Sequence, residues 1–187
     1  MLLSKRFAFP MAIAFALATF GTTQALEPGV SPLQELYMIK ELTNGSEIVG
    51  VMLNIGEGDH ADLLTKIQRA SAQTGMKVVV AEVTQLSEVA QKFRELKESY
   101  HIQVLWVPQD ESVIGSPISR DFLIKNSTLS SIPLFAPNQD WVTSGACVAL
   151  SLEGGSVKLY VNRKTLAALG LKVPDKYIPS TQFLASN

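Results

Sequence analysis

Polar and aromatic side chains that could hold a small solute follow two short apolar runs of this chain. Gln109 and Asp110 come directly after the first run, and Asn138 and Trp141 come after the second. Parallel α/β proteins place ligand-binding loops at the carboxyl ends of buried strands. A carboxylate can hold an amino group, an amide can donate to a carboxylate, and an indole can stack on a ring. We therefore expect these four residues to contact a small organic solute.

Each of these residues also has an ordinary structural interpretation. Asp110 could cap its loop, and Gln109 could simply be solvated. Asn138 is favoured as a cap of the following turn, because Asn and Asp are the residues that such turns select. For Trp141, burial in the core or in an interface is favoured over stacking on a ligand.

Asn54 is a supporting candidate at the end of another apolar run. The segment NIGEG, Asn54–Gly58, opens a helix whose free N–H groups could attract an anion. Two glycines at this spacing are a weak signal, so a plain turn is the favoured interpretation. The sequence contains no dinucleotide-binding or P-loop fingerprint, and we expect no cofactor.

The remaining reactive side chains do not form a recognisable catalytic or metal-binding motif. His60 and His101 have no partners at metal-ligand spacing, so we expect no metal site. Ser116 is better explained as a helix cap than as a nucleophile. Cys147 is the only cysteine and lies in an apolar run, which favours a buried, inert thiol over a reactive one. We therefore expect a protein that is not an enzyme.

The first 25 residues have the pattern of a cleavable secretory signal. Lys5 and Arg6 precede the apolar stretch Phe7–Phe20, and Thr23-Gln24-Ala25 supplies a small-residue cleavage site. An uncleaved anchor is the alternative. We expect a periplasmic protein whose residues 26–187 form one domain. The net charge of −1 and the lack of a basic patch argue against nucleic acid as a partner.

Strand-like and helix-like segments alternate in the part of the chain that carries the candidate residues. We expect strands at 48–53, 77–83, 104–107 and 132–135, and helices at 33–42, 59–75, 87–100 and from Ser116-Pro117 onward. Ile118, Phe122 and Leu123 are expected to form the buried face of the last helix. Repeated β-α units of this length predict a Rossmann-like, three-layer α/β domain with a mainly parallel sheet.

The last third of the chain has a different pattern. Apolar residues alternate at 148–152 and 157–161 around the turn signal Glu153–Ser156, which predicts an antiparallel hairpin at one sheet edge. Asn162 is expected to cap a helix that runs through Leu169 and is closed by Gly170.

The segment from Leu33 to Trp141 resembles the second lobe of ABC-transporter substrate-binding proteins, including periplasmic tryptophan- and aromatic-amino-acid-binding members. The similarity lies in LQELYMIKELTNGSEIVGVMLN, VLWVPQD, IPLFAPNQDWVTSGA and the terminal VNRKTLAALGLKVP. It implies a periplasmic-binding-protein lobe that recognises a small organic solute, such as an amino acid. It also implies a membrane transporter as partner.

Members of that family bind their ligand in a cleft between two lobes, whereas this chain has room for one lobe. Self-association as a homodimer, or a membrane partner, would then complete the pocket. The alternative is a periplasmic interaction or regulatory protein that binds a membrane sensor instead of a solute.

Overall fold

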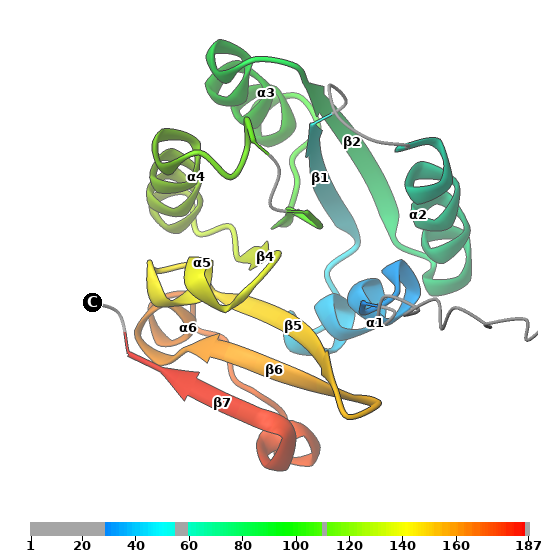
Figure 1. Cartoon of the computed structure of the whole chain (residues 1–187), viewed down its shortest axis with the longest axis vertical. Coiled ribbons are helices and arrows are strands. Elements are labelled where there is room, and N and C mark those ends of the chain that lie inside the picture. Colours follow the sequence, from blue (N-terminus) through cyan, green and yellow to red (C-terminus); the bar gives the residue numbers. More distant parts are fainter. Residues whose placement is uncertain (1–28, 55–59, 110–111, 186–187) are drawn as a thin grey trace, which may run out of the picture.

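The computed structural model describes residues 29–54, 60–109 and 112–185, and within them one sheet of seven strands (Figure 1). The strands are β1 (Ile48–Asn54), β2 (Lys77–Val83), β3 (Val104–Trp106), β4 (Leu134–Ala136), β5 (Val148–Glu153), β6 (Ser156–Asn162) and β7 (Thr181–Leu184). Their order in the sheet is β2-β1-β3-β4-β5-β6-β7. The predicted leader at 1–25 and residue 59, where the second helix was expected to begin, lie outside the described residues.

Helices connect most of these strands. They are α1 (Pro32–Leu42), α2 (His60–Thr74), α3 (Leu86–Glu98), α4 (Pro117–Leu129), α5 (Gln139–Thr143), α6 (Arg163–Ala168) and the 3-10 helix η1 (Asp175–Ser180). The predicted start of α4 is confirmed, because Ser116 caps it and Pro117 occupies its first position. None of the helices in the described ranges is long and apolar enough to cross a bilayer.

Five of the six strand pairs are parallel. β1 pairs with β2 and β3, and the parallel arrangement continues through β4 to β5. Short β-α connections force this arrangement, because a parallel neighbour needs a crossover and a helix supplies it. The predicted α/β fold with a mainly parallel sheet is confirmed.

The predicted hairpin is present but does not form the sheet edge. β5 and β6 are antiparallel around Gly154 and Gly155, whose φ angles of 56° and 78° suit glycine. β7 pairs with β6 in parallel and lies outside it. The sequence prediction missed β7 because its four residues, TQFL, carry little apolar alternation and follow the proline-containing helix η1.

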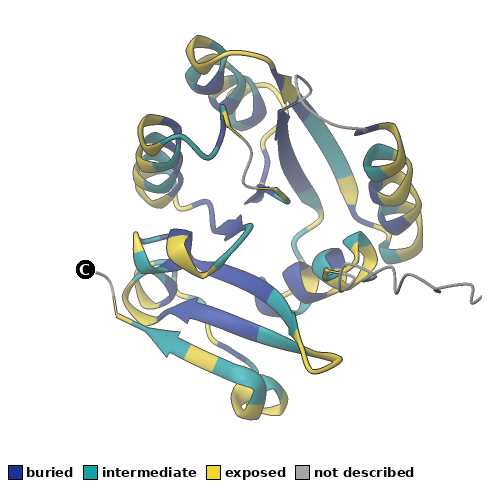
Figure 2. Ribbon diagram, viewed as in Figure 1, coloured by how far each residue is buried: buried dark blue, intermediate teal, exposed yellow. Residues whose placement is uncertain are grey.

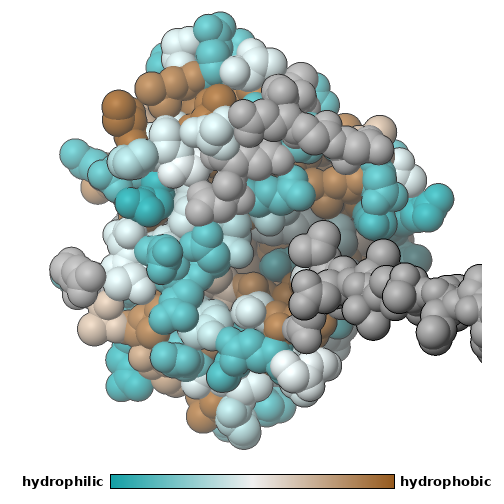
Figure 3. All heavy atoms as spheres, in the orientation of Figure 1, coloured by the Kyte–Doolittle hydropathy of each residue, from teal (hydrophilic) through white to brown (hydrophobic). Residues whose placement is uncertain are grey.

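Two apolar clusters cover the two faces of the sheet. α1 and α2 contribute Leu36, Ile39 and Ile67 to one cluster, together with Trp106 of β3. α3, α4 and α5 form the other cluster with alternate residues of the same strands. In Figure 2 the inner strands are buried, whereas β2, β7 and the outer faces of the helices are partly exposed. The face drawn in Figure 3 carries separate hydrophobic patches within a mainly hydrophilic surface.

The buried face of α4 differs from the one expected from the sequence. Its buried residues are Ser119, Leu123 and Ser127, which repeat every four positions. Phe122 is partly buried and meets Phe93 edge-on, with ring centroids 6.0 Å apart. The expectation for Ile118 was wrong, because this side chain is 68% exposed. One residue before Ser119, it points about 100° away from the buried row.

Candidate functional site

A cavity of about 390 Å³ opens where β3, β4 and β5 end. Its lining includes Trp106, Pro108 and Gln109 after β3, Pro137 after β4, and Leu150, Ser151 and Leu152 of β5. The volume lies at the lower end of the range for small-molecule sites. The cavity therefore occupies the carboxyl edge of the sheet, where the sequence predicted the ligand-binding loops.

The strand ends create this space. Pro108 and Pro137 stand shortly after the last residues of β3 and β4, and proline cannot donate a hydrogen bond to a sheet ladder. The last backbone bond between the two strands runs from Val107 N–H to the Phe135 carbonyl at 2.9 Å. Beyond this hydrogen bond, the segments that follow β3 and β4 leave the sheet. Glu35 in the first turn of α1 and Leu63 in the first turn of α2 line the opposite side of the cavity.

Most residues of the cavity lining have apolar side chains, while polar atoms present slightly more of the lining surface. Trp106 is 2% exposed and belongs to the cluster under α1 and α2. Leu63, Leu150 and Leu152 lie on the same wall, and the two prolines complete it. Such a lining suits a ligand that has both an apolar part and polar groups.

Glu35 of α1 is the only titratable side chain that lines the cavity among the described residues. Burial raises the pKa of its carboxyl to about 8. Within the described part of the chain, no hydrogen bond or ion pair reaches this carboxyl. Its position is fixed locally, because Ser31 caps α1 and exchanges hydrogen bonds with Gln34.

The sequence prediction missed Glu35. An acidic residue in the first turn of a helix is normally explained by its favourable interaction with the helix dipole. Only the fold shows that this turn faces the ends of β3 and β5. In the sequence alone, nothing distinguishes Glu35 from the other carboxylates on helix surfaces.

The structure brings Gln109 to the cavity and places the other described candidates elsewhere. Asn138 caps α5, where its Oδ1 accepts from the N–H groups of Asp140 at 3.1 Å and Trp141 at 3.4 Å. Trp141 is fully buried in the cluster under α3, α4 and α5, on the opposite face of the sheet from Trp106. Asn54 is 1% exposed at the end of β1 and is not a lining residue. Asp110 lies outside the described residues.

Cys147 has the buried position that its sequence context indicated. Burial raises the pKa of its thiol to about 12, so the reactive thiolate is scarce at neutral pH. Across the described ranges, no group of three His, Cys, Asp or Glu side chains is placed to hold a metal ion.

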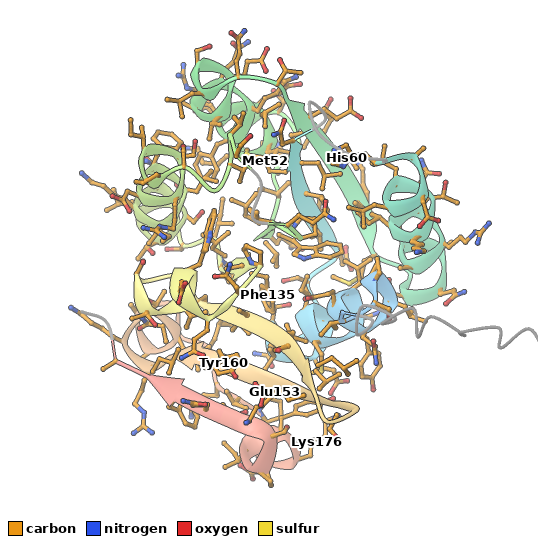
Figure 4. The ribbon with its side chains drawn as sticks, in the orientation of Figure 1. Met52, His60, Phe135, Glu153, Tyr160 and Lys176 are labelled. Atoms are coloured by element: carbon orange, nitrogen blue, oxygen red, sulfur yellow. The ribbon has the colours of Figure 1, made fainter. Side chains whose placement is uncertain are left out.

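Charged groups of the hairpin are paired with one another, away from the cavity wall. Glu153 accepts from Lys158 Nζ at 2.7 Å and from the Tyr160 hydroxyl, and Figure 4 shows Glu153 and Tyr160 side by side. The hydrogen bond from Lys158 holds the pKa of the Glu153 carboxyl below its usual range. Lys176 of η1 pairs in the same way with Glu41 of α1. These charged groups are paired with one another within the fold. We therefore do not assign them to a ligand site.

Comparison with known proteins gives one family match and several similar structures. The family described as ABC transporter substrate binding protein matches residues 30–157. No curated protein sequence matches the chain. A substrate-binding protein with adhesive properties from Clostridium difficile, in its ligand-free, open form, is 22% identical with a TM-score of 0.71. It covers 84% of this chain, which spans 61% of that protein.

Two further structures have similar scores. A conserved domain protein from Vibrio cholerae is 18% identical with a TM-score of 0.70, over 83% of this chain and 60% of that one. The ABC domain from Streptococcus pneumoniae, in complex with L-Trp, is 16% identical with a TM-score of 0.70. The match covers 82% of this chain and 62% of that one. This chain therefore spans about three-fifths of the length of each of these proteins.

Proposed function

The chain belongs to the family of ABC transporter substrate-binding proteins, and we propose that it binds a small organic solute in the cavity at the ends of β3, β4 and β5. The observation that carries this proposal is the cavity itself. It lies at the carboxyl edge of a parallel sheet, where open α/β folds bind their ligands. Its apolar side chains, together with Glu35, Gln109 and Ser151, are of the kinds that line small-molecule sites.

We propose a role in recognition rather than catalysis. Among the described residues the cavity offers one carboxyl, one amide and the Ser151 hydroxyl, and no hydrogen bond joins this hydroxyl to the carboxyl as in an activated nucleophile. Such a set can orient a ligand, while the apolar side chains bury the apolar part of the ligand.

We further propose that the protein acts in the periplasm after export and delivers its solute to a membrane transporter. The family match and the signal-like pattern at 1–25 support this location. A single layer of strand ends covers only part of a ligand, whereas good sites bury roughly 70–90% of it. A second copy of the chain, or the transporter, would cover the rest.

The test is calorimetric titration of the protein with aromatic amino acids and related amines, alcohols and carboxylates. Leu152→Trp fills the cavity, whereas Leu129→Trp makes the same change on α4, where Leu129 is 73% exposed. We expect at least one solute to bind, with affinity reduced by about tenfold or more in Leu152→Trp and unchanged in Leu129→Trp.

Two results would contradict the proposal. One is that no solute of the panel binds to the folded protein, which would favour a role in binding a membrane sensor or another protein. The other is that Leu152→Trp binds as tightly as Leu129→Trp while circular dichroism shows both variants folded.

A further inference from the structure

We propose that the cavity selects solutes that carry a protonated amine on an apolar body, and that Glu35 is the group that holds the amine. This inference rests on the proposed function and adds the chemical class of the ligand. It concerns a residue that none of the sequence motifs indicated.

The first argument is the composition of the cavity. Trp106, Leu63, Leu150 and Leu152 supply apolar surface, and Glu35 supplies the only ionisable group among the described lining residues. A ligand that matches both features has an apolar body and a positive group. An anionic ligand would place like charges together, or would force the carboxyl to stay protonated.

The second argument is that, among the described residues, no cation pairs with this carboxyl. Farther along α1, Lys40 donates to the Thr74 carbonyl at 2.7 Å, and Glu41 pairs with Lys176. These groups are therefore engaged away from the cavity.

In the described ranges of the neighbouring elements, no cationic side chain lines the cavity either. On α2, His60 is buried at the first position, and Asp62 pairs with Lys66 at 2.6 Å. On β5, Glu153 is paired with Lys158. The described residues of β3, β4 and the segments that directly follow them contribute no ionisable side chain to the lining.

The third argument is the state of the carboxyl in the empty cavity. Burial raises its pKa to about 8, so at pH 7 the neutral form dominates. An ammonium group beside it favours the charged form and lowers this pKa again. Binding of a protonated amine is therefore coupled to the release of a proton, and a neutral analogue lacks this coupling.

The coupling gives a quantitative signature. At pH 7 we expect the binding of an amine to release close to one proton, because most of the free carboxyl is protonated. Below about pH 8 the affinity should rise by about tenfold for each unit of pH. The heat of binding should therefore differ between buffers with different ionisation enthalpies.

The experiment uses 2-phenylethylamine and 2-phenylethanol, which share the apolar body and differ in charge. Both are titrated at pH 6, 7 and 8 into the full chain, into Glu35→Gln, and into Glu41→Gln as a control on the same helix. We expect the amine to bind at least about tenfold more tightly than the alcohol at pH 8. Glu35→Gln should remove this preference and the proton release, and Glu41→Gln should retain both.

The inference is overturned if the alcohol binds as well as the amine, if Glu35→Gln keeps the preference, or if neither probe binds. These failures are distinguishable from failure of the proposed function. If other solutes of the panel still bind and Leu152→Trp still weakens them, the cavity is a solute site with a different selectivity. If nothing binds, both proposals fail.

Discussion

Glu35 has its carboxyl at a position where the charged form is disfavoured. Desolvation raises the pKa of this carboxyl, and among the described residues no hydrogen-bond partner replaces the lost hydration. A group kept in such an environment reduces the stability of the folded protein. Strongly perturbed carboxyls in cavities are more common at functional sites than elsewhere, which is why this residue ranks above the polar loop residues.

The first prediction is that Glu35→Gln stabilises the protein at alkaline pH. The folded pKa of about 8 lies above the ordinary value of 4.5, so the folded state binds the proton more tightly than the unfolded state. The carboxyl therefore destabilises the fold increasingly as the pH rises from 4.5 to 8. Because the side chain is only partly buried, we expect a gain of about 1–3 kcal/mol at pH 8, measured by urea unfolding.

Glu41→Gln is the matched control, because its effect on the free energy of unfolding is expected to have the opposite sign. The hydrogen bond from Lys176 lowers the pKa of Glu41, so its contribution is present at neutral pH and is lost as the pH falls. Glu41→Gln should therefore lower stability at pH 7. Equal stability of Glu35→Gln and the parent protein at pH 8 would show that the carboxyl is not desolvated.

For single residues, the sequence predicted helix-capping roles better than it predicted which residues line the cavity. Ser116 and Asn138 have side chains whose preferred local hydrogen bonds decide their positions, so their capping roles could be predicted from local sequence alone. Trp141 could not be assigned to a face of the sheet, because a short helix after a strand can present its ring to either side. The role of Glu35 depends on strands that are far away in sequence.

Among the elements, β1 contains a position that close packing restricts. It lies between β2 and β3, and its residue Gly50 faces the α3 side of the sheet. A Cβ atom at this position would lie 2.8 Å from Ile102 Cδ1 and 3.2 Å from Leu96 Cδ1. A side chain at position 50 would therefore have to displace Ile102, so close packing rather than an unusual backbone angle favours glycine here.

We accordingly predict that Gly50→Val lowers the free energy of unfolding by about 1–3 kcal/mol, because overpacking displaces neighbours in a dense core. Ile102→Ala removes the obstructing atoms and is itself destabilising. The double variant should lose about 1 kcal/mol less free energy of unfolding than the sum of the losses in the two single variants, as measured by denaturant unfolding. Strictly additive losses would show that the side chain at position 50 does not meet Ile102.

The elements that the sequence predicted well are those with strong periodic patterns. β2 was expected at 77–83 and occupies that range, and α1 differs by one residue from the expected range. η1 and β7 were missed because a proline-containing turn and a four-residue edge strand leave weak patterns. The face of α4 was wrong at Ile118 because small polar residues, Ser119 and Ser127, form part of its buried row.

At the scale of the whole molecule, the fold presents one sheet whose carboxyl edge carries the cavity. The family match covers residues 30–157, and this span contains every described residue of the cavity wall except Gly29. The β-α alternation was sufficient to predict the mainly parallel sheet, and the cavity lies at the carboxyl edge where the ligand-binding loops were expected. It could not predict which of the loops would meet, because that depends on where each strand ends.

A two-dimensional amide NMR titration of the full chain with 2-phenylethylamine tests most directly whether the cavity at the ends of β3, β4 and β5 binds a solute. We expect the largest chemical-shift changes in the first turn of α1 around Glu35, in Leu63, in the indole N–H of Trp106 and in Leu150–Leu152. Changes confined to the opposite face of the sheet, for example along α4, would contradict the account, as would a spectrum that does not change at all.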